Sequence, residues 1–157
     1  MSTTTLVKTL KDMLLNANAH VTFADAVKQL PPELRGIRPE KMPYSVWELV
    51  EHIRLSQFDI LDFSRNPDYR ELEWPKDYWP KSKAPKDDAA WQKSIAQVDA
   101  DLHTFIGLLE APGVDLFKPF PHGNGQHLCR EAVLLVDHNS YHTGEIVAVR
   151  RALEAWH

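Results

Sequence analysis

Residues 135–149 read LVDHNSYHTGEIVAV, and this stretch decides the fold that the sequence predicts. At 3.6 residues per turn, one face of a helix carries Leu135, His138, His142 and Ile146. Side chains four residues apart on a helix lie one above the other, so the two imidazoles project from the same face. Both histidines therefore stand where an amphipathic helix carries the apolar residues that it buries.

The helix around this stretch extends from about Gln126 to about Ala155, and three further amphipathic stretches precede it. In each of them apolar residues recur at spacings of three and four, which is typical of helices with one buried face. The segment Ser45–Glu48 fits a capping box and marks the start of the second stretch. The three predicted helices cover about 4–30, 45 to about 64, and the segment between Asp87 and Pro112.

Four amphipathic helices with no strand pattern between them predict an all-α fold. We expect a four-helix bundle formed by a single domain over residues 1–157. Proline-rich segments separate the helices, and two of the three connections are long. A simple up-and-down order of the helices is therefore not required.

Composition narrows the classes of function. The formal net charge of −4 predicts no basic face, so we expect no nucleic-acid partner. No apolar run approaches the roughly 20 residues of a membrane span, and the first residues lack a signal-peptide pattern, so we expect no membrane association. Cys129 is the only cysteine, which excludes an intrachain disulfide and favours a reducing compartment, the cytoplasm.

His52 supplies a third imidazole at the edge of the apolar stripe on the second predicted helix. A buried imidazole without a partner is costly, and a metal ion bound by His52, His138 and His142 would satisfy all three rings. Three histidines without a fourth ligand of similar quality describe a catalytic type of site with open coordination positions. The alternative is that each ring is a core residue hydrogen-bonded to a carbonyl, and spacing alone leaves both interpretations open.

Several segments of the chain are similar to one known family. Pro43–His52 and Val136–Ile146 resemble the DinB superfamily of bacterial proteins, whose members are also described as DinB/YfiT-like metalloenzymes. The segment Asp77–Pro80 and the tail Arg150–Leu153 are similar to it as well. The resemblance covers most of the chain in order and spacing, and it implies a four-helix bundle.

This resemblance also implies a metal site and a class of chemistry. The family's ligand positions fall here on His52, His138 and His142, and the ion in relatives is zinc, nickel or another divalent metal. The family includes S-transferases and isomerases that use low-molecular-weight thiols, and many of its members are dimers. We therefore expect a divalent metal ion, a small-molecule substrate, a thiol cosubstrate and a homodimer.

Three other residues are candidates for roles beside the metal, each with a simpler alternative. Glu145 follows His142 by three residues and is a candidate general base for a metal-bound water, or an ordinary solvated or ion-paired carboxylate. His20 is a candidate proton carrier, or a partly buried, hydrogen-bonded ring. Tyr141 is a candidate for the rim of the substrate site, or it packs in the core or in a dimer.

Three hypotheses of function follow from these patterns. The first is a metal-dependent enzyme, either a transferase that joins a thiol to a small electrophile or a hydrolase. The second is a non-catalytic protein of a stress response that binds a metal or a small molecule. The third is a structural dimer whose histidines only fill the core.

Overall fold

Helices form all the regular secondary structure of residues 2–156, the part of the chain that the computed structural model describes. The α-helices are α1 (Thr3–Leu15), α2 (Phe23–Val27), α3 (Val46–Arg65), α4 (Asp88–Leu109) and α5 (Leu128–Ala152), and a short 3-10 helix spans Pro32–Leu34. No β-strand lies within residues 2–156. The predicted all-α class is confirmed.

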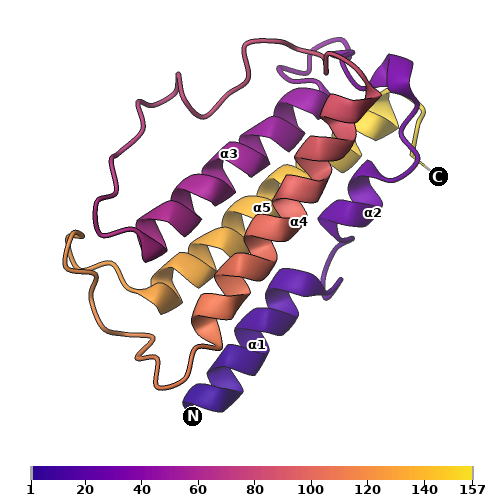
Figure 1. Ribbon diagram of the computed structural model, residues 1–157. Coiled ribbons are helices and arrows are strands. Elements are labelled where there is room, and N and C mark those ends of the chain that lie inside the picture. The colour runs from indigo at the N-terminus through magenta and orange to yellow at the C-terminus, as the bar shows by residue number, and fades with distance from the viewer. Residues whose placement is uncertain (1, 157) are drawn as a thin grey trace.

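The four longer helices lie side by side, and α3 and α4 run in the same direction (Figure 1). Helices α1 and α5 run the opposite way, so α3 packs against α4 in parallel and against α5 in antiparallel orientation. The parallel pair is possible because residues 66–87 form a long crossover that returns along the outside of the molecule. Residues of this crossover, Tyr78 among them, therefore contact α3.

Helix α3 begins where the sequence predicts it. The Ser45 hydroxyl accepts a hydrogen bond from the Glu48 N–H, and the Glu48 carboxylate accepts one from the Ser45 N–H at 2.9 Å, so the predicted capping box is confirmed. The Ser45 hydroxyl also donates to the Lys83 carbonyl at 2.6 Å. The Ser45 cap therefore starts α3 and also fastens the far end of the crossover to it.

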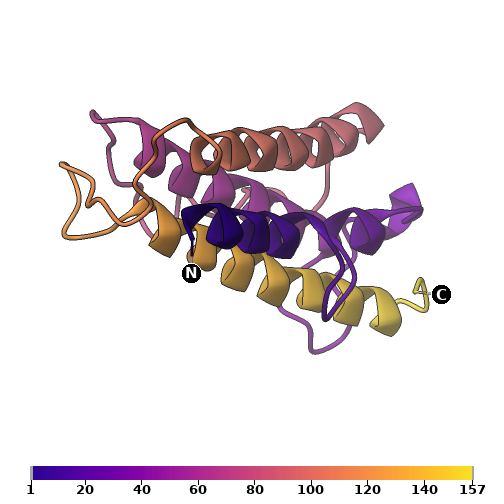
Figure 2. The same ribbon diagram turned by 90° about the horizontal axis from the view of Figure 1, so that it is seen from below.

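The predicted helix over about 4–30 is wrong, because the chain breaks between α1 and α2. The Asn18 side chain donates to the carbonyls of Asp12 and Asn16 at 3.2 and 3.3 Å, which turns the chain away at the end of α1. The Thr22 hydroxyl then accepts from the Asp25 N–H and starts α2. Both helices follow one another along α5 (Figure 2), and both bury apolar residues: Leu10 on α1, and Ala26 and Val27 on α2.

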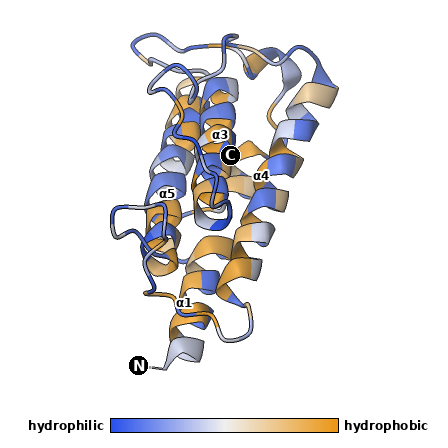
Figure 3. Cartoon of the chain, turned by 60° about the vertical axis from the view of Figure 1, so that its left-hand side comes forward, coloured by the Kyte–Doolittle hydropathy of each residue, from blue (hydrophilic) through white to orange (hydrophobic). Residues whose placement is uncertain are grey.

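The apolar core consists of two clusters, one toward each end of the helices. On α3 the first cluster ends at Ile53 and the second begins at Ile60, while on α5 the corresponding limits are Ile146 and Leu135. Apolar residues follow the inner faces of the helices, and hydrophilic residues dominate the loops (Figure 3). Between the two clusters, α3 and α5 face each other with polar side chains.

No helix within residues 2–156 combines the length and the apolar character that crossing a bilayer requires.

Candidate metal centre

The polar layer between α3 and α5 brings together the three histidines singled out in the sequence. One ring nitrogen from each of His52, His138 and His142 lies within 4.8 Å of the other two. The Nε2 atoms of His52 and His138 are 3.2 Å apart, and the ring centroids of His52 and His142 are 4.4 Å apart. His52 and His142 are buried and His138 is half-buried. Within residues 2–156, no other group of His, Cys, Asp and Glu has this geometry.

The crossover fixes the orientation of His52. Its Nδ1–H donates to the Tyr78 carbonyl at 2.7 Å, and because a carbonyl only accepts, the proton of the neutral ring must reside on Nδ1. Trp79 stacks on the imidazole with centroids 4.0 Å apart and an interplanar angle of 2°, and Tyr44 stacks on the other side of Trp79. His52 therefore presents the lone pair of Nε2 to the other two histidines.

A chain of amide groups fixes His138. The Gln57 amide nitrogen donates to the Val98 carbonyl at 2.6 Å, so its oxygen faces Asn139 and accepts the Asn139 amide N–H at 2.8 Å. The Asn139 oxygen then faces His138 and accepts from its Nδ1 at 3.3 Å. Each amide has only one orientation in which both its nitrogen and its oxygen form these hydrogen bonds. The Asn139 oxygen therefore requires the proton of the neutral His138 ring to be on Nδ1.

Glu145 fixes His142 from one turn further along α5. Its carboxylate accepts from the Nδ1 of His142 at 2.7 Å, which again leaves Nε2 as the free nitrogen of the ring. Burial raises the pKa of the Glu145 carboxyl. The bond from Nδ1 fixes the orientation of the His142 ring.

These bonds direct three Nε2 lone pairs toward one point. Burial lowers the pKa of His52 and of His142 to about 4, and it lowers the pKa of His138 as well, so all three rings are neutral at pH 7. No proton remains on an Nε2 atom to bridge two rings, and the facing lone pairs of His52 and His138 repel each other. A divalent cation removes this repulsion, and imidazole nitrogen suits zinc and nickel. The donor set therefore fits the predicted ion.

The other three candidate residues lie in different places. Glu145 contacts His142, as described above. Tyr141 is 65% exposed, and its ring meets the edge of His142 at a centroid distance of 4.9 Å, which places it at the outer rim of the cluster. His20 is not part of the cluster, because its ring nitrogens bond to Ser140 and to the Val21 carbonyl.

Sequence reasoning missed two parts of this arrangement. The Tyr78 carbonyl is a backbone group, and no residue type signals that a loop carbonyl returns to a particular histidine. Gln57 lies on the buried face of α3, and a polar residue at such a position is a signal of a hydrogen-bond network.

Comparison with protein-family models, curated proteins and solved structures found no match to this chain. The similarity to the DinB superfamily therefore rests on the quoted segments alone.

Proposed function

We propose that this protein is a metal-dependent enzyme of the DinB type. In this proposal His52, His138 and His142 hold a divalent ion, zinc or nickel, and the helices form the family's four-helix bundle. The observation that carries the proposal is the convergence of three deprotonated Nε2 atoms, each fixed by an acceptor on its Nδ1. Core histidines need only one acceptor each and have no reason to turn their lone pairs toward one another.

The reaction that we propose is transfer of a thiol to a small electrophile, and water-driven hydrolysis is the alternative that uses the same site. A divalent ion bound by three imidazoles keeps coordination positions for other ligands and lowers the pKa of a thiol or water bound there. The protein's own residues orient the ligands and exclude water. Trp79 covers one face of His52, and Glu145 keeps the Nδ1 proton of His142.

Metal content tests the site. Protein purified without a histidine tag should contain close to one equivalent of a divalent metal per chain, and single changes to alanine at His52, His138 or His142 should lower it sharply. The helical circular dichroism signal should remain. His103→Ala is the matched control, because His103 lies exposed on α4 and should not affect metal content. A folded triple variant that keeps its full metal content would refute the site.

A thiol-transfer assay tests the reaction. We expect metal-loaded protein to join at least one low-molecular-weight thiol to 1-chloro-2,4-dinitrobenzene, with displacement of chloride. A chelator should abolish turnover, and zinc or nickel should restore it. Metal binding without turnover for any thiol, any divalent ion or an activated ester would instead indicate a non-catalytic metal-binding protein. Sedimentation at several concentrations tests the homodimer that we include in the proposal.

A further inference from the structure

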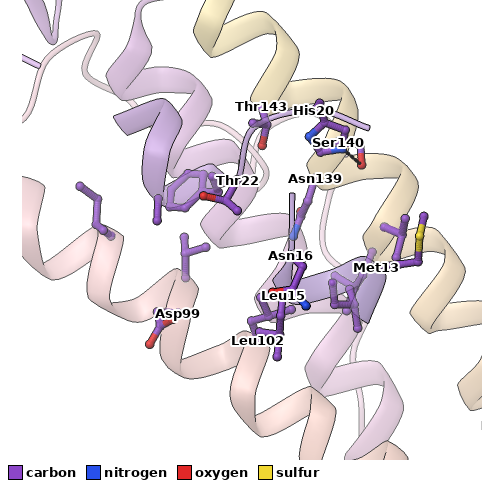
Figure 4. A pocket seen from close by; sticks show the side chains of 17 residues that line it. Met13, Leu15, Asn16, His20, Thr22, Asp99, Leu102, Asn139, Ser140 and Thr143 are labelled. Carbon is purple, nitrogen blue, oxygen red and sulfur yellow. Dashed lines mark hydrogen bonds between the residues drawn. The ribbon is translucent and has the colours of Figure 1, made fainter. Parts of the chain in front are cut away.

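The break between α1 and α2 leaves a cavity of about 150 Å³ against α4 and α5 (Figure 4). Leu102 of α4 and Leu135 of α5 belong to its lining, and the exposed residues Asn16 and Ala24 stand at its rim. His52, His138 and His142 do not line it. The cavity therefore shares no histidine with the candidate metal centre, although it adjoins it through Asn139, which lines the cavity and bonds to His138.

One hydroxyl group faces the cavity without a protein partner among the described residues. Thr143 is 2% exposed, lines the cavity, and makes no side-chain hydrogen bond within residues 2–156. Thr9 and Thr104, by contrast, donate their hydroxyls to the carbonyl four residues earlier in their helices. The Thr143 oxygen points from α5 toward the segment that carries Thr22 (Figure 4). A ligand that forms a hydrogen bond with this hydroxyl is therefore favoured over one of the same shape that cannot.

The remaining polar groups of the wall limit the chemistry of the ligand. The His20 Nδ1–H donates to the Val21 carbonyl and its Nε2 accepts from the Ser140 hydroxyl, both at 2.8 Å, so these two side chains satisfy each other. No Lys or Arg lines the cavity, and Asp99 at its rim disfavours an anion. The other walls are largely apolar, with Phe23 among them.

We propose that this cavity binds a small neutral molecule of about the size of benzene that carries one hydrogen-bonding group, such as a phenol. An apolar cavity of about 150 Å³ is large enough for benzene. The ring lies against Leu102, Leu135 and Phe23, and the polar group bonds to the Thr143 hydroxyl. The proposal does not depend on the metal or on the proposed reaction.

Fluorine NMR of 4-fluorophenol with the full chain tests this proposal, with chelator and with zinc. We expect saturable binding in both conditions. Thr143→Val keeps the shape of the side chain but removes its hydroxyl, so it should weaken binding about three- to tenfold. 4-Fluorotoluene lacks the hydroxyl group and should bind the wild type and Thr143→Val equally. Thr143→Ser restores the hydroxyl and should bind 4-fluorophenol more tightly than Thr143→Val.

A second variant tests the location. Ala24→Phe places a large side chain at the rim and should abolish binding of both probes, while Ala96→Phe, at an exposed position of α4 outside the cavity, should leave binding unchanged. The proposal is overturned if 4-fluorophenol shows no saturable binding to the folded wild type, or if Ala24→Phe binds it as well as the wild type does.

Discussion

Asn139 lies between the buried Gln57 side chain and the His138 ring, and it forms a hydrogen bond with each. Its amide nitrogen donates to the Gln57 oxygen, and its own oxygen accepts from His138. The orientation of the His138 imidazole therefore depends on two amides that are not themselves candidate metal ligands. Groups that hold the second nitrogen of a ligand histidine in this way commonly affect metal affinity by 10- to 100-fold.

We predict that Asn139→Ala weakens zinc binding by roughly 10- to 100-fold, because His138 loses the acceptor that keeps its proton on Nδ1. Competition with a chromophoric chelator measures the affinity. Asn124→Ala in the exposed loop before α5 is the control and should bind zinc like the wild type. Equal affinity for the Asn139 variant would show that the amide chain does not orient the ring.

At the scale of elements, the crossover of residues 66–87 does the most to shape the site. Tyr69 and Tyr78 donate their hydroxyls to the two oxygens of the Asp59 carboxylate at 2.8 and 2.7 Å, which fastens the crossover to α3. Burial and the Asp59 carboxylate raise the pKa of both phenols, so they remain donors at every physiological pH. The same segment supplies the Tyr78 carbonyl and the Trp79 ring to His52.

Tyr78→Phe removes one of these donors while Tyr69 still serves Asp59. We expect the free energy of unfolding to fall by about 1.5 kcal/mol, and zinc affinity to fall as well because the Tyr78 carbonyl becomes less fixed. Urea denaturation and zinc titration measure the two effects. Tyr44→Phe is the matched control, since the Tyr44 ring stacks on Trp79 and only its hydroxyl is lost. Wild-type values for Tyr78→Phe would refute the anchoring role.

Most elements were predictable from sequence because apolar periodicity and caps act locally. The predicted starts and ends of α3, α4 and α5 agree with the structure to within a few residues. The helix predicted over about 4–30 failed because Asn16 and Asn18 end α1 through side-chain bonds, while the apolar period continues through α2. Apolar periodicity indicates which residues pack against another helix. Two short helices that pack on the same helix, α5, can show the same apolar spacing as one long helix.

The candidate site was predictable in part. The His138–His142 spacing and the apolar stripe around it indicated that both rings face inward, and the structure places His52 beside them. Two of the acceptors that select the Nε2 atoms depend on tertiary structure, because the Tyr78 carbonyl comes from the crossover and the Asn139 amide is oriented by Gln57 of α3. The bond from His142 to Glu145 is local, at a separation of three residues on a helix, and this spacing is a signal that sequence reasoning can use.

At the scale of the whole molecule, a hydrogen bond to a buried carboxylate joins α3 and α4. Glu51 of α3 is 8% exposed and accepts hydrogen bonds from Arg54 on its own helix and from Ser94 of α4 at 2.6 Å. Burial raises the pKa of Glu51, but the bonds from Arg54 and Ser94 outweigh it, so the pKa lies below its ordinary value of 4.5. A carboxyl whose pKa is lower in the folded than in the unfolded state stabilises the fold at pH values above its unfolded-state pKa. This stabilisation is lost as the pH falls through the folded-state pKa.

We therefore predict that Glu51→Gln is less stable than the wild type at pH 7, and that the difference shrinks as the pH falls below about 4.5. Urea denaturation at a series of pH values measures both free energies. Glu40→Gln, at an exposed position, should parallel the wild type at every pH. A difference that stays constant down to acid pH would show that the Glu51 charge does not contribute.

Metal binding should also stabilise the whole fold, because its ligands come from two helices that are together only when the chain is folded. Zinc at 100 times its dissociation constant should raise the free energy of unfolding by about 2.7 kcal/mol. Chemical denaturation with zinc and with chelator gives this difference. Magnesium prefers oxygen ligands and serves as the control ion. The same difference in the His52/His138/His142→Ala variant would mean that zinc acts elsewhere.

The position of the histidines along the chain sets the time at which the centre can form during biosynthesis. His52 and His138 are 86 residues apart, and His142 follows still later. A chain emerging from the ribosome carries one imidazole of the three until translation reaches His138, near the middle of α5. The proposed centre can therefore form only after both histidines of α5 have been made, and a nascent chain truncated before residue 138 offers His52 alone.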